Sequence, residues 1–318
     1  MKRVKTYEDF VAGVKEAVEN DLHKMYLAID HASGHRFWSY KDFAAEKFFL
    51  QITLDNYDEM EINPDYPVLT YNSKVVEALL ENGLTKEENV YNRPEHIKKS
   101  GSKAEFHKML EGDENIPKTA FTPEDALEIG FPLIAKPAEG HSGLGIQIFK
   151  SKEEFDAADH DKFDVYSQYI DKKSEHRLVT FKGEILTWLN RHPMNDKAKS
   201  GDGEGKEKMM FKYVKRDEKK APEKFKALIK KFGEIFKDLP YICFDVMEDQ
   251  DGKLYIIESN SQPGVPFDLT VQIYRTLFKD FYGREVNAEA DKKLAEYSKY
   301  LDDRTVNLEP DRFEVNLD

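Results

Sequence analysis

The residues best suited to chemistry in this sequence are Asp245, Glu258 and Asn260, which all carry side-chain oxygens. Carboxylate and amide oxygens are the ligands that Mg²⁺ and Mn²⁺ prefer, and a bound Mg²⁺ usually also takes substrate phosphates. Two neighbouring carboxylates repel each other unless a positive charge lies between them. The three side chains therefore indicate a divalent metal site. The alternative is a solvated sheet face, on which scattered acids are ordinary.

These residues belong to a predicted β-hairpin over 241–264. Two runs rich in Ile, Val, Phe and Tyr flank a polar, Gly-containing cluster, and that composition is typical of two strands joined by a turn. If Glu248 pairs with Lys253, Asp245 lies opposite Ile256.

With this pairing, the two-residue period of a strand sorts the hairpin side chains onto two faces. The expected core face is almost wholly apolar and consists of Ile242, Phe244, Val246, Tyr255 and Ile257. The other face carries Asp245, Met247, Glu258 and Asn260. Asp245 and Glu258 become diagonal neighbours about 7–8 Å apart at the backbone, from where both side chains can converge on one cation.

A second candidate site is the Gly-rich segment 138–145, which lies between a predicted strand ending in Lys136 and a predicted strand over 146–150. Glycines let backbone N–H groups approach phosphate oxygens, and a lysine adds positive charge. The glycine spacing matches neither the P-loop nor the dinucleotide fingerprint. The segment is therefore compatible with a phosphate clamp and also with an ordinary hairpin turn.

Composition narrows the function classes. The 318 residues are 40% hydrophobic and 34% charged, with a formal net charge of −13. This charge argues against nucleic acid or a membrane surface as the main partner. The single cysteine, Cys243, excludes an internal disulfide framework and a cysteine-based zinc site. No secretory signal and no apolar run of about 20 residues is seen, so we expect a cytoplasmic protein without a membrane partner.

The elements that must position these residues begin with a small α/β module over 1–99. We expect a helix within 1–30, a buried strand over 48–54, and a strand followed by a helix over 68–82. The polar, basic stretch 91–102 marks a boundary.

The remainder of the chain predicts mixed helices and strands. Expected helices cover 103–112, 152–158, 222–237, 268–282 and 286–301. Expected strands cover 131–136, 164–170, 178–181 and 184–189. The polar, Gly-containing segment 195–208 is the best candidate for a mobile lid or a disordered loop.

Residues 100–283 resemble the ATP-grasp superfamily, and in particular carboxylate–amine ligases such as D-alanine–D-alanine ligase, bacterial glutathione synthetase and the ribosomal-protein glutamate ligases. Four elements occur in the order typical of that superfamily: Lys103 opening a short helix, KPAEGHSGLG from Lys136 to Gly145, the hinge run Ser167 to Ile170, and the hairpin from Asp245 to Gly264. The resemblance implies an α+β fold: an N-terminal α/β module over 1–99, a small ATP-grasp subdomain over 100–171 and a C-terminal subdomain over 172–318.

The same resemblance implies roles for individual residues. ATP would be bound by Lys103, Lys136, Glu139, His141, Ser142, Gly143, Gly145, Gln168, Tyr169, Ile170, Glu175 and Met247. In this set Glu175 is the expected ribose partner, and His141 either touches the phosphates or is simply exposed. Asp245, Glu258 and Asn260 would hold Mg²⁺, or Mn²⁺ in its place. Lys136 and Arg191 would be catalytic, with Arg191 meeting the γ-phosphate.

The implied reaction is ATP-dependent ligation of a carboxylate to an amine through an acyl phosphate, releasing ADP and phosphate. The substrate would be a small molecule or peptide, and a homodimer is compatible with the family. Two alternatives stay open: a kinase acting on a small hydroxyl substrate, and a non-catalytic nucleotide-binding module. The sequence departs from the family at Gln168, where an acid commonly meets the adenine amine, and in the long charged segment 195–208.

Overall fold

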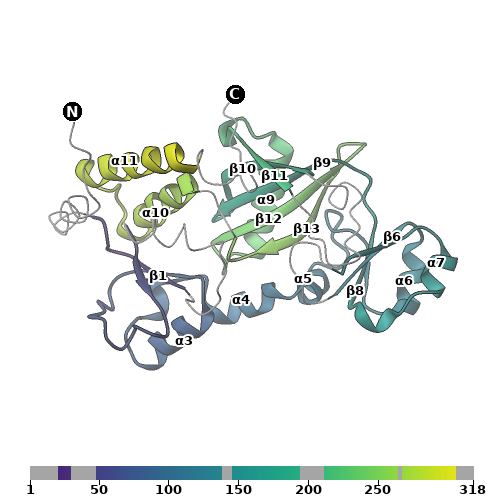
Figure 1. The fold of residues 1–318 in the computed structure, drawn as a ribbon, viewed down its shortest axis with the longest axis horizontal. Coiled ribbons are helices and arrows are strands. Elements are labelled where there is room, and N and C mark those ends of the chain that lie inside the picture. The colour runs from purple at the N-terminus through teal and green to yellow at the C-terminus, as the bar shows by residue number, and fades with distance from the viewer. Residues whose placement is uncertain (1–20, 30–47, 138–144, 194–210, 264–266, 306–318) are drawn as a thin grey trace. The chain divides into compact units, whose positions relative to one another are not determined.

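The computed structural model describes residues 21–29, 48–137, 145–193, 211–263 and 267–305. The chain divides into two compact units, Met1–Pro94 with Gly264–Leu308 and Glu95–Pro263 with Glu309–Asp318 (Figure 1). The described strands of each unit form their own sheets. None of the helices in the described ranges is long and apolar enough to cross a membrane.

The first unit contains a parallel sheet in the order β2-β1-β3-β4. Its strands are β1 (Tyr26–Ala28), β2 (Leu50–Ile52), β3 (Val68–Thr70) and β4 (Val90–Tyr91). Helix α3 (Ser73–Glu81) begins where the Asn72 side chain accepts hydrogen bonds from two backbone N–H groups, as an N-cap does. Strand β1 lies within 1–30, where we expected a helix, and residues 1–20 lie outside the described part of the chain.

Two C-terminal helices complete this unit: α10 (Phe267–Tyr282) and α11 (Ala288–Thr305). The Tyr274 ring of α10 lies 5.0 Å from that of Phe49. The Arg284 guanidinium, which follows α10, binds the buried Asp21 carboxylate at 2.5 and 2.7 Å. These contacts group the helices with the N-terminal module, whereas we expected 172–318 to form one subdomain.

The second unit begins around α4 (Pro94–Gly101) and α5 (Lys103–Met109) and contains two antiparallel sheets. The smaller sheet has the order β5-β8-β6-β7. Its strands are β5 (Thr119–Ala120), β6 (Leu133–Lys136), β7 (Gln147–Phe149) and β8 (Val165–Gln168). Helices α6 (Pro123–Ile129) and α7 (Lys152–Asp156) accompany it, and Phe149, Phe155 and Tyr166 fill its core.

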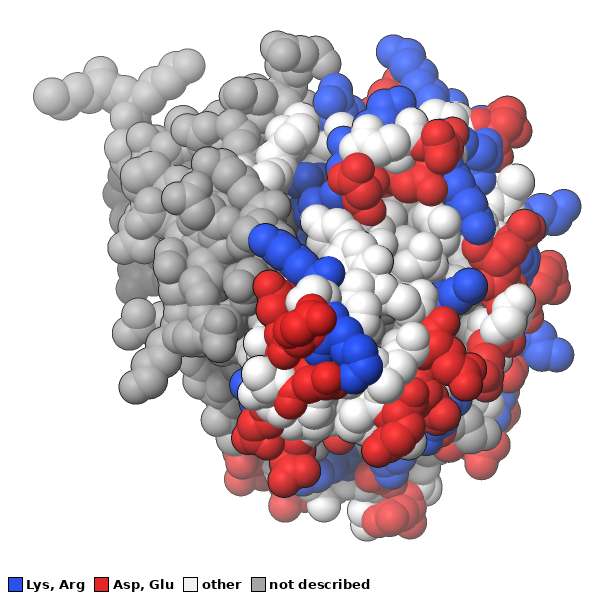
Figure 2. All heavy atoms as spheres, turned by 90° about the vertical axis from the view of Figure 1, so that its right-hand side faces the viewer, with Lys and Arg blue, Asp and Glu red and all other residues white. Residues whose placement is uncertain are grey.

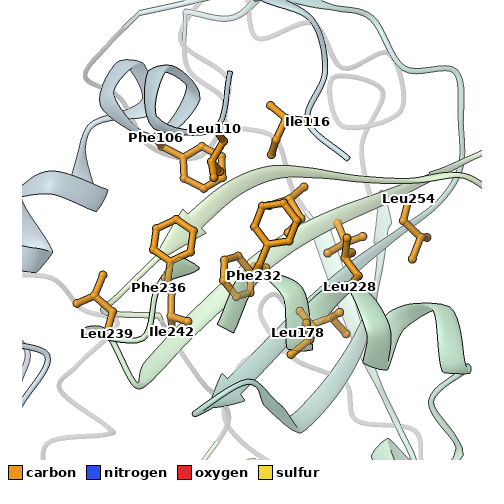
Figure 3. Close-up of a cluster of buried hydrophobic side chains, with 14 of the residues drawn as sticks. Phe106, Leu110, Ile116, Leu178, Leu228, Phe232, Phe236, Leu239, Ile242 and Leu254 are labelled. Carbon is orange, nitrogen blue, oxygen red and sulfur yellow. The ribbon is translucent and has the colours of Figure 1, made fainter. Parts of the chain in front are cut away.

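The larger sheet has the order β11-β10-β9-β12-β13. Its strands are β9 (Lys172–Phe181), β10 (Glu184–Pro193), β11 (Phe211–Arg216), β12 (Tyr241–Asp249) and β13 (Leu254–Asn260). Helix α9 (Glu223–Ile235) packs its apolar residues into the hydrophobic cluster that Figure 3 shows, with Phe232 close to Leu228 and Phe236. Three-residue 3₁₀ helices occur at Glu87–Asn89, His160–Lys162 and Glu218–Lys220.

The β12–β13 hairpin differs from the expected pairing. Met247 pairs with Tyr255 and Val246 with Ile256, but Asp245 pairs with Glu258, so Ile257 is an extra residue in a β-bulge. On β12 the expected core residues are buried in the cluster, as predicted. On β13 the core residues are Leu254 and Ile256, whereas we expected Tyr255 and Ile257, because the pairing is shifted by one residue.

Candidate active site

One face of the larger sheet carries a row of charged side chains on adjacent strands. Arg177 of β9 pairs directly with Asp245 of β12, which pairs directly with Glu258 of β13. Directly paired residues in a sheet project from the same face. The three side chains therefore share a face, and the bulge makes Asp245 and Glu258 direct neighbours, closer than the diagonal arrangement that we expected.

Asp245 is held by two guanidinium groups. Its two carboxylate oxygens accept hydrogen bonds from Arg177 Nε at 2.8 Å and Nη2 at 2.9 Å, and Arg191 Nη1 lies 3.5 Å away. Burial opposes ionisation of Asp245, but the charge and hydrogen bonds of Arg177, together with Arg191, hold its pKa below the usual value. Asp245 is therefore an ionised, buried carboxylate.

A second ion-pair group joins strands β9 and β10 of the same sheet. Glu175 of β9 is buried and bonded to Arg191 Nη1 and to Lys172 Nζ, the latter at 2.6 Å. The ring of Tyr213, which pairs with Arg191 across β10 and β11, lies 5.1 Å from the Arg177 guanidinium carbon. An aromatic face near a guanidinium favours the cation. Glu175, the expected ribose partner, is thus bound to two cations here.

Lys136 ends strand β6 and is buried. Burial, with the positive charge of Lys103, lowers its pKa to about 8, while Glu258 and Glu175 act in the opposite direction. Lys103 lies in the first turn of α5, which Ser102 caps. The two lysines predicted to bind phosphate are therefore close enough to repel each other electrostatically, as cations converging on one anion would.

The metal prediction can be compared with this geometry. Asp245 and Glu258 oppose each other directly, and Asn260 lies two residues beyond Glu258 on β13. The donors are oxygen atoms, as a hard divalent cation requires. Among the described residues no cluster of three His, Cys, Asp or Glu side chains could hold a metal, so the amide of Asn260 and a substrate phosphate would have to complete the coordination. The donor set fits Mg²⁺, provided that the ion takes the place of Arg177 on Asp245.

Three of the predicted adenine-binding residues lie at the end of the smaller sheet, and the fourth, Met247, lies on the larger sheet. Gln168 is the last residue of β8, and its backbone N–H donates to Lys118 O at 2.8 Å. The N–H of Tyr169 donates to Pro132 O at 3.3 Å, and Ile170 is buried. Met247 is partly exposed and lies opposite Glu175 on the charged face.

Part of the predicted phosphate clamp lies outside the described residues, namely Glu139, His141, Ser142 and Gly143. The described chain resumes at Gly145, whose φ is +75°. A Cβ atom there would lie 3.2 Å from Pro137 Cγ. The positive φ therefore favours glycine at this position, and a Cβ atom would in addition require a small shift of the Pro137 ring.

Sequence reasoning missed Arg177, Tyr213 and Lys172. Arg177 lies two residues after Glu175, so strand alternation alone places the two on one face. Its pairing with Asp245, 68 positions away along the chain, appears only once the strands are aligned. No comparable pattern in the sequence singles out Tyr213 or Lys172.

No protein-family model and no curated protein sequence matches the chain. Similar solved structures exist, however. D-alanine–D-alanine ligase from Bacillus anthracis has a TM-score of 0.56 at 16% identity, covering 88% of this chain and 99% of that one.

Two further structures share the fold. The ATP-grasp ligase PsnB, complexed with a minimal precursor, has a TM-score of 0.52 at 12% identity and covers 76% of this chain and 91% of that one. N5-carboxyaminoimidazole ribonucleotide synthetase from Thermotoga maritima has a TM-score of 0.52 at 11% identity, covering 83% and 77%. The chain thus shares the fold of these solved ATP-grasp proteins, and the predicted α+β class is confirmed.

Proposed function

We propose that this protein is an ATP- and Mg²⁺-dependent ligase that joins a carboxylate to an amine and releases ADP and phosphate. The observation that carries the proposal is the charged sheet face, on which Asp245 directly opposes Glu258 beside Arg177 and Arg191. A solved neighbour, D-alanine–D-alanine ligase from Bacillus anthracis, is complexed with ATP, which supports nucleotide binding by the same fold.

The reaction has two steps. A carboxylate oxygen of the substrate attacks the γ-phosphorus of ATP, and ADP leaves. The amine then attacks the acyl carbon, phosphate leaves, and the amine proton is lost to the surroundings. Both steps need positioning and positive charge rather than a nucleophilic side chain.

The residues divide these tasks. Lys103 and Lys136 bind phosphate oxygens, and Arg191 with Arg177 supplies positive charge to the transferring phosphoryl group and the acyl oxygens. Asp245, Glu258 and Asn260 would hold Mg²⁺, which supplies further neutralisation of phosphate charge when bound. Fold alone does not define the acid or the amine.

The charge distribution supports a small-molecule or peptide substrate. Acidic and basic side chains are interspersed over the described part of the face in Figure 2, and the net charge of −13 disfavours nucleic acid. We also propose that the enzyme is cytoplasmic, as expected from the sequence.

The test is magnesium-dependent ADP formation in a phosphate-release screen over amino acids and short peptides, with mass spectrometry of the product. We expect Glu258→Gln to abolish turnover while the protein stays folded, because one metal-binding carboxylate is lost. Asp251→Asn, an exposed acid in the turn of the same hairpin, serves as the matched control and should keep full activity. Unchanged turnover in Glu258→Gln would remove the metal assignment, and phosphate transfer to a hydroxyl would favour a kinase.

A further inference from the structure

The outer edge of strand β13 is covered by the chain that follows α5. Strand edges carry unpaired backbone groups that need partners. Ile256 N–H donates to Asn115 O at 2.8 Å, and Asn115 Nδ2 donates to Leu254 O at 3.0 Å. Lys231 of α9 in turn binds Asp113 at 2.7 Å. Asn115, which lies outside the sheet, therefore hydrogen-bonds the β13 backbone on both sides of Tyr255.

The bulge lies directly beyond this contact, and His107 is bonded to it. The buried His107 imidazole hydrogen-bonds the backbone of Ile257, the extra residue. On its other side, Nδ1 lies 3.3 Å from Thr119 Oγ1. The ring thus spans from β13 to strand β5.

The bulge determines the orientation of Glu258. If the pairing of Val246 with Ile256 continued without the extra residue, Asp245 would oppose Ile257, and Glu258 would turn to the opposite face. A one-residue shift of register moves a side chain across the sheet. That opposite face is the apolar cluster under α9. A carboxylate there would be buried without a charged partner, which is unfavourable. Glu258 can face Asp245 only if the bulge is kept.

His107 also connects the bulge to the two lysines. It lies four residues after Lys103 on α5, so both side chains project from one side of the helix. It also lies near enough to Lys136 to feel its charge. Burial, followed by the charge of Lys136, lowers the pKa of His107 to about 3. The ring is therefore neutral near pH 7 and adds no third positive charge to the lysine pair.

We propose that His107 is a positioning residue that couples metal binding to nucleotide binding, by holding the Ile257 bulge that keeps Glu258 opposite Asp245. The inference rests on the proposed function, because it assigns Lys103 and Lys136 to phosphate and Glu258 to the metal. His107 touches neither ligand in this account. It acts by fixing the position of Glu258 relative to the helix that carries Lys103.

The alternative is that His107 only fills space in the interior. An apolar residue of similar size would then serve equally well, and only stability would change when the packing changed. The two accounts differ in the thermodynamic coupling between metal and nucleotide, which is the ratio of nucleotide affinities with and without Mg²⁺. Coupling of this kind typically amounts to about 5–150-fold.

The experiment measures this ratio by titration calorimetry of the full-length protein with a non-hydrolysable ATP analogue, in MgCl₂ or in EDTA. His107→Leu removes the hydrogen bonds at similar volume. His107→Gln keeps an amide N–H that can reach a backbone carbonyl. Leu110→Ala is the matched control, because Leu110 caps the C-terminus of α5, is buried and belongs to the apolar cluster. Thr119→Val is a milder variant that replaces His107→Leu if the latter does not fold.

We expect wild type and Leu110→Ala to show the same coupling, with Leu110→Ala melting at a lower temperature. We expect His107→Leu to reduce the ratio by about fivefold or more, Thr119→Val to reduce it less, and His107→Gln to retain most of it. A ratio in His107→Leu equal to that of wild type would overturn the inference. If Thr119→Val is used instead, a wild-type ratio in that variant would overturn it as well. Wild type that binds the analogue with no effect of Mg²⁺ would overturn the proposed function itself, which makes the two failures distinguishable.

Discussion

The two faces of the larger sheet are made by the same strands but have opposite chemistry. On one face Leu178, Phe244 and Val246 are buried under α9. On the other, Arg177 and Asp245, which are sequence neighbours of these three residues, form a buried ion pair. Burial of apolar area stabilises a fold by roughly 25 cal/mol per Å². A buried ion pair is often no more stabilising than apolar residues of similar size, so the charged face is better explained by ligand binding than by stability.

The largest loss of stability is expected when the packing of the apolar face is disrupted. Phe232 of α9 is fully buried, with its ring 6.1 Å from that of Phe244. Phe232→Ala should lower the free energy of unfolding by about 3–5 kcal/mol, because it removes buried area and leaves a cavity. Denaturant unfolding measures the loss. Ile235→Ala, at a 42% exposed position of the same helix, should change it by less than about 1 kcal/mol. Equal losses would mean that α9 does not cover the sheet as described.

An intermediate effect is expected from breaking the charged face. Arg177→Met leaves Asp245 buried with Arg191 as its remaining cation, so we expect a loss of about 2–3 kcal/mol at pH 7, somewhat below the usual cost of breaking a buried pair. The loss should depend on pH. Since Arg177 lowers the pKa of Asp245, the pair stabilises the protein above the unfolded-state pKa of about 3.9 and ceases to do so as pH falls through the lower folded-state value.

Denaturant unfolding of wild type and Arg177→Met between pH 3 and pH 7 tests this. The difference between their free energies of unfolding should become smaller as the pH is lowered. Lys152→Met is the control. Its partner Asp156 is bound at 2.6 Å, but both side chains are more than half exposed, so the loss should be below about 1 kcal/mol at any pH. A difference between wild type and Arg177→Met that is constant with pH would contradict the ion-pair account.

The smallest expected effect concerns Lys136. Because its pKa is about 8, the free protein loses this charge as pH rises through that value. Nucleotide affinity should then fall by up to about tenfold between pH 7 and pH 9, or about 1.4 kcal/mol. Stability should not fall in parallel, because a lysine with a lowered folded-state pKa is relieved of a buried charge as pH rises toward about 10.4.

Calorimetric titrations at several pH values measure this dependence. The charges of Glu258, Lys103 and Glu175 also act on Lys136. Lys136→Arg keeps a positive charge at all these pH values and should remove the dependence. The same fall in Lys136→Arg as in wild type would show that another group titrates.

Strand alternation was sufficient to predict one strand of the hairpin but not the other. On β12 the acid Asp245 lies between Phe244 and Val246, so the core face containing these two apolar residues follows from the sequence. On β13 the run Leu254 to Ile257 is apolar throughout, and period two alone cannot show which residues face the core. The bulge at Ile257 depends on contacts with distant residues, namely His107 and Asn115, which no local pattern reveals.

The candidate site could likewise be predicted only in part from the sequence. The metal-binding candidates Asp245 and Glu258 stood out because two acids interrupt apolar strands. Arg177 could have been singled out by its spacing from Glu175, but its bond to Asp245 results from pairing between β9 and β12. Buried charge pairs across strands depend on which strands are neighbours and in what register. This pairing cannot be derived from local patterns in a single sequence.

The most direct measurement of the central claim is an anomalous-scattering map of crystals soaked with Mn²⁺ and a slowly hydrolysed ATP analogue. We predict a manganese peak between Asp245 and Glu258, beside the analogue phosphates, with Arg177 displaced from Asp245. Bound analogue with no peak at these carboxylates, and with Arg177 still bonded to Asp245, would contradict the account.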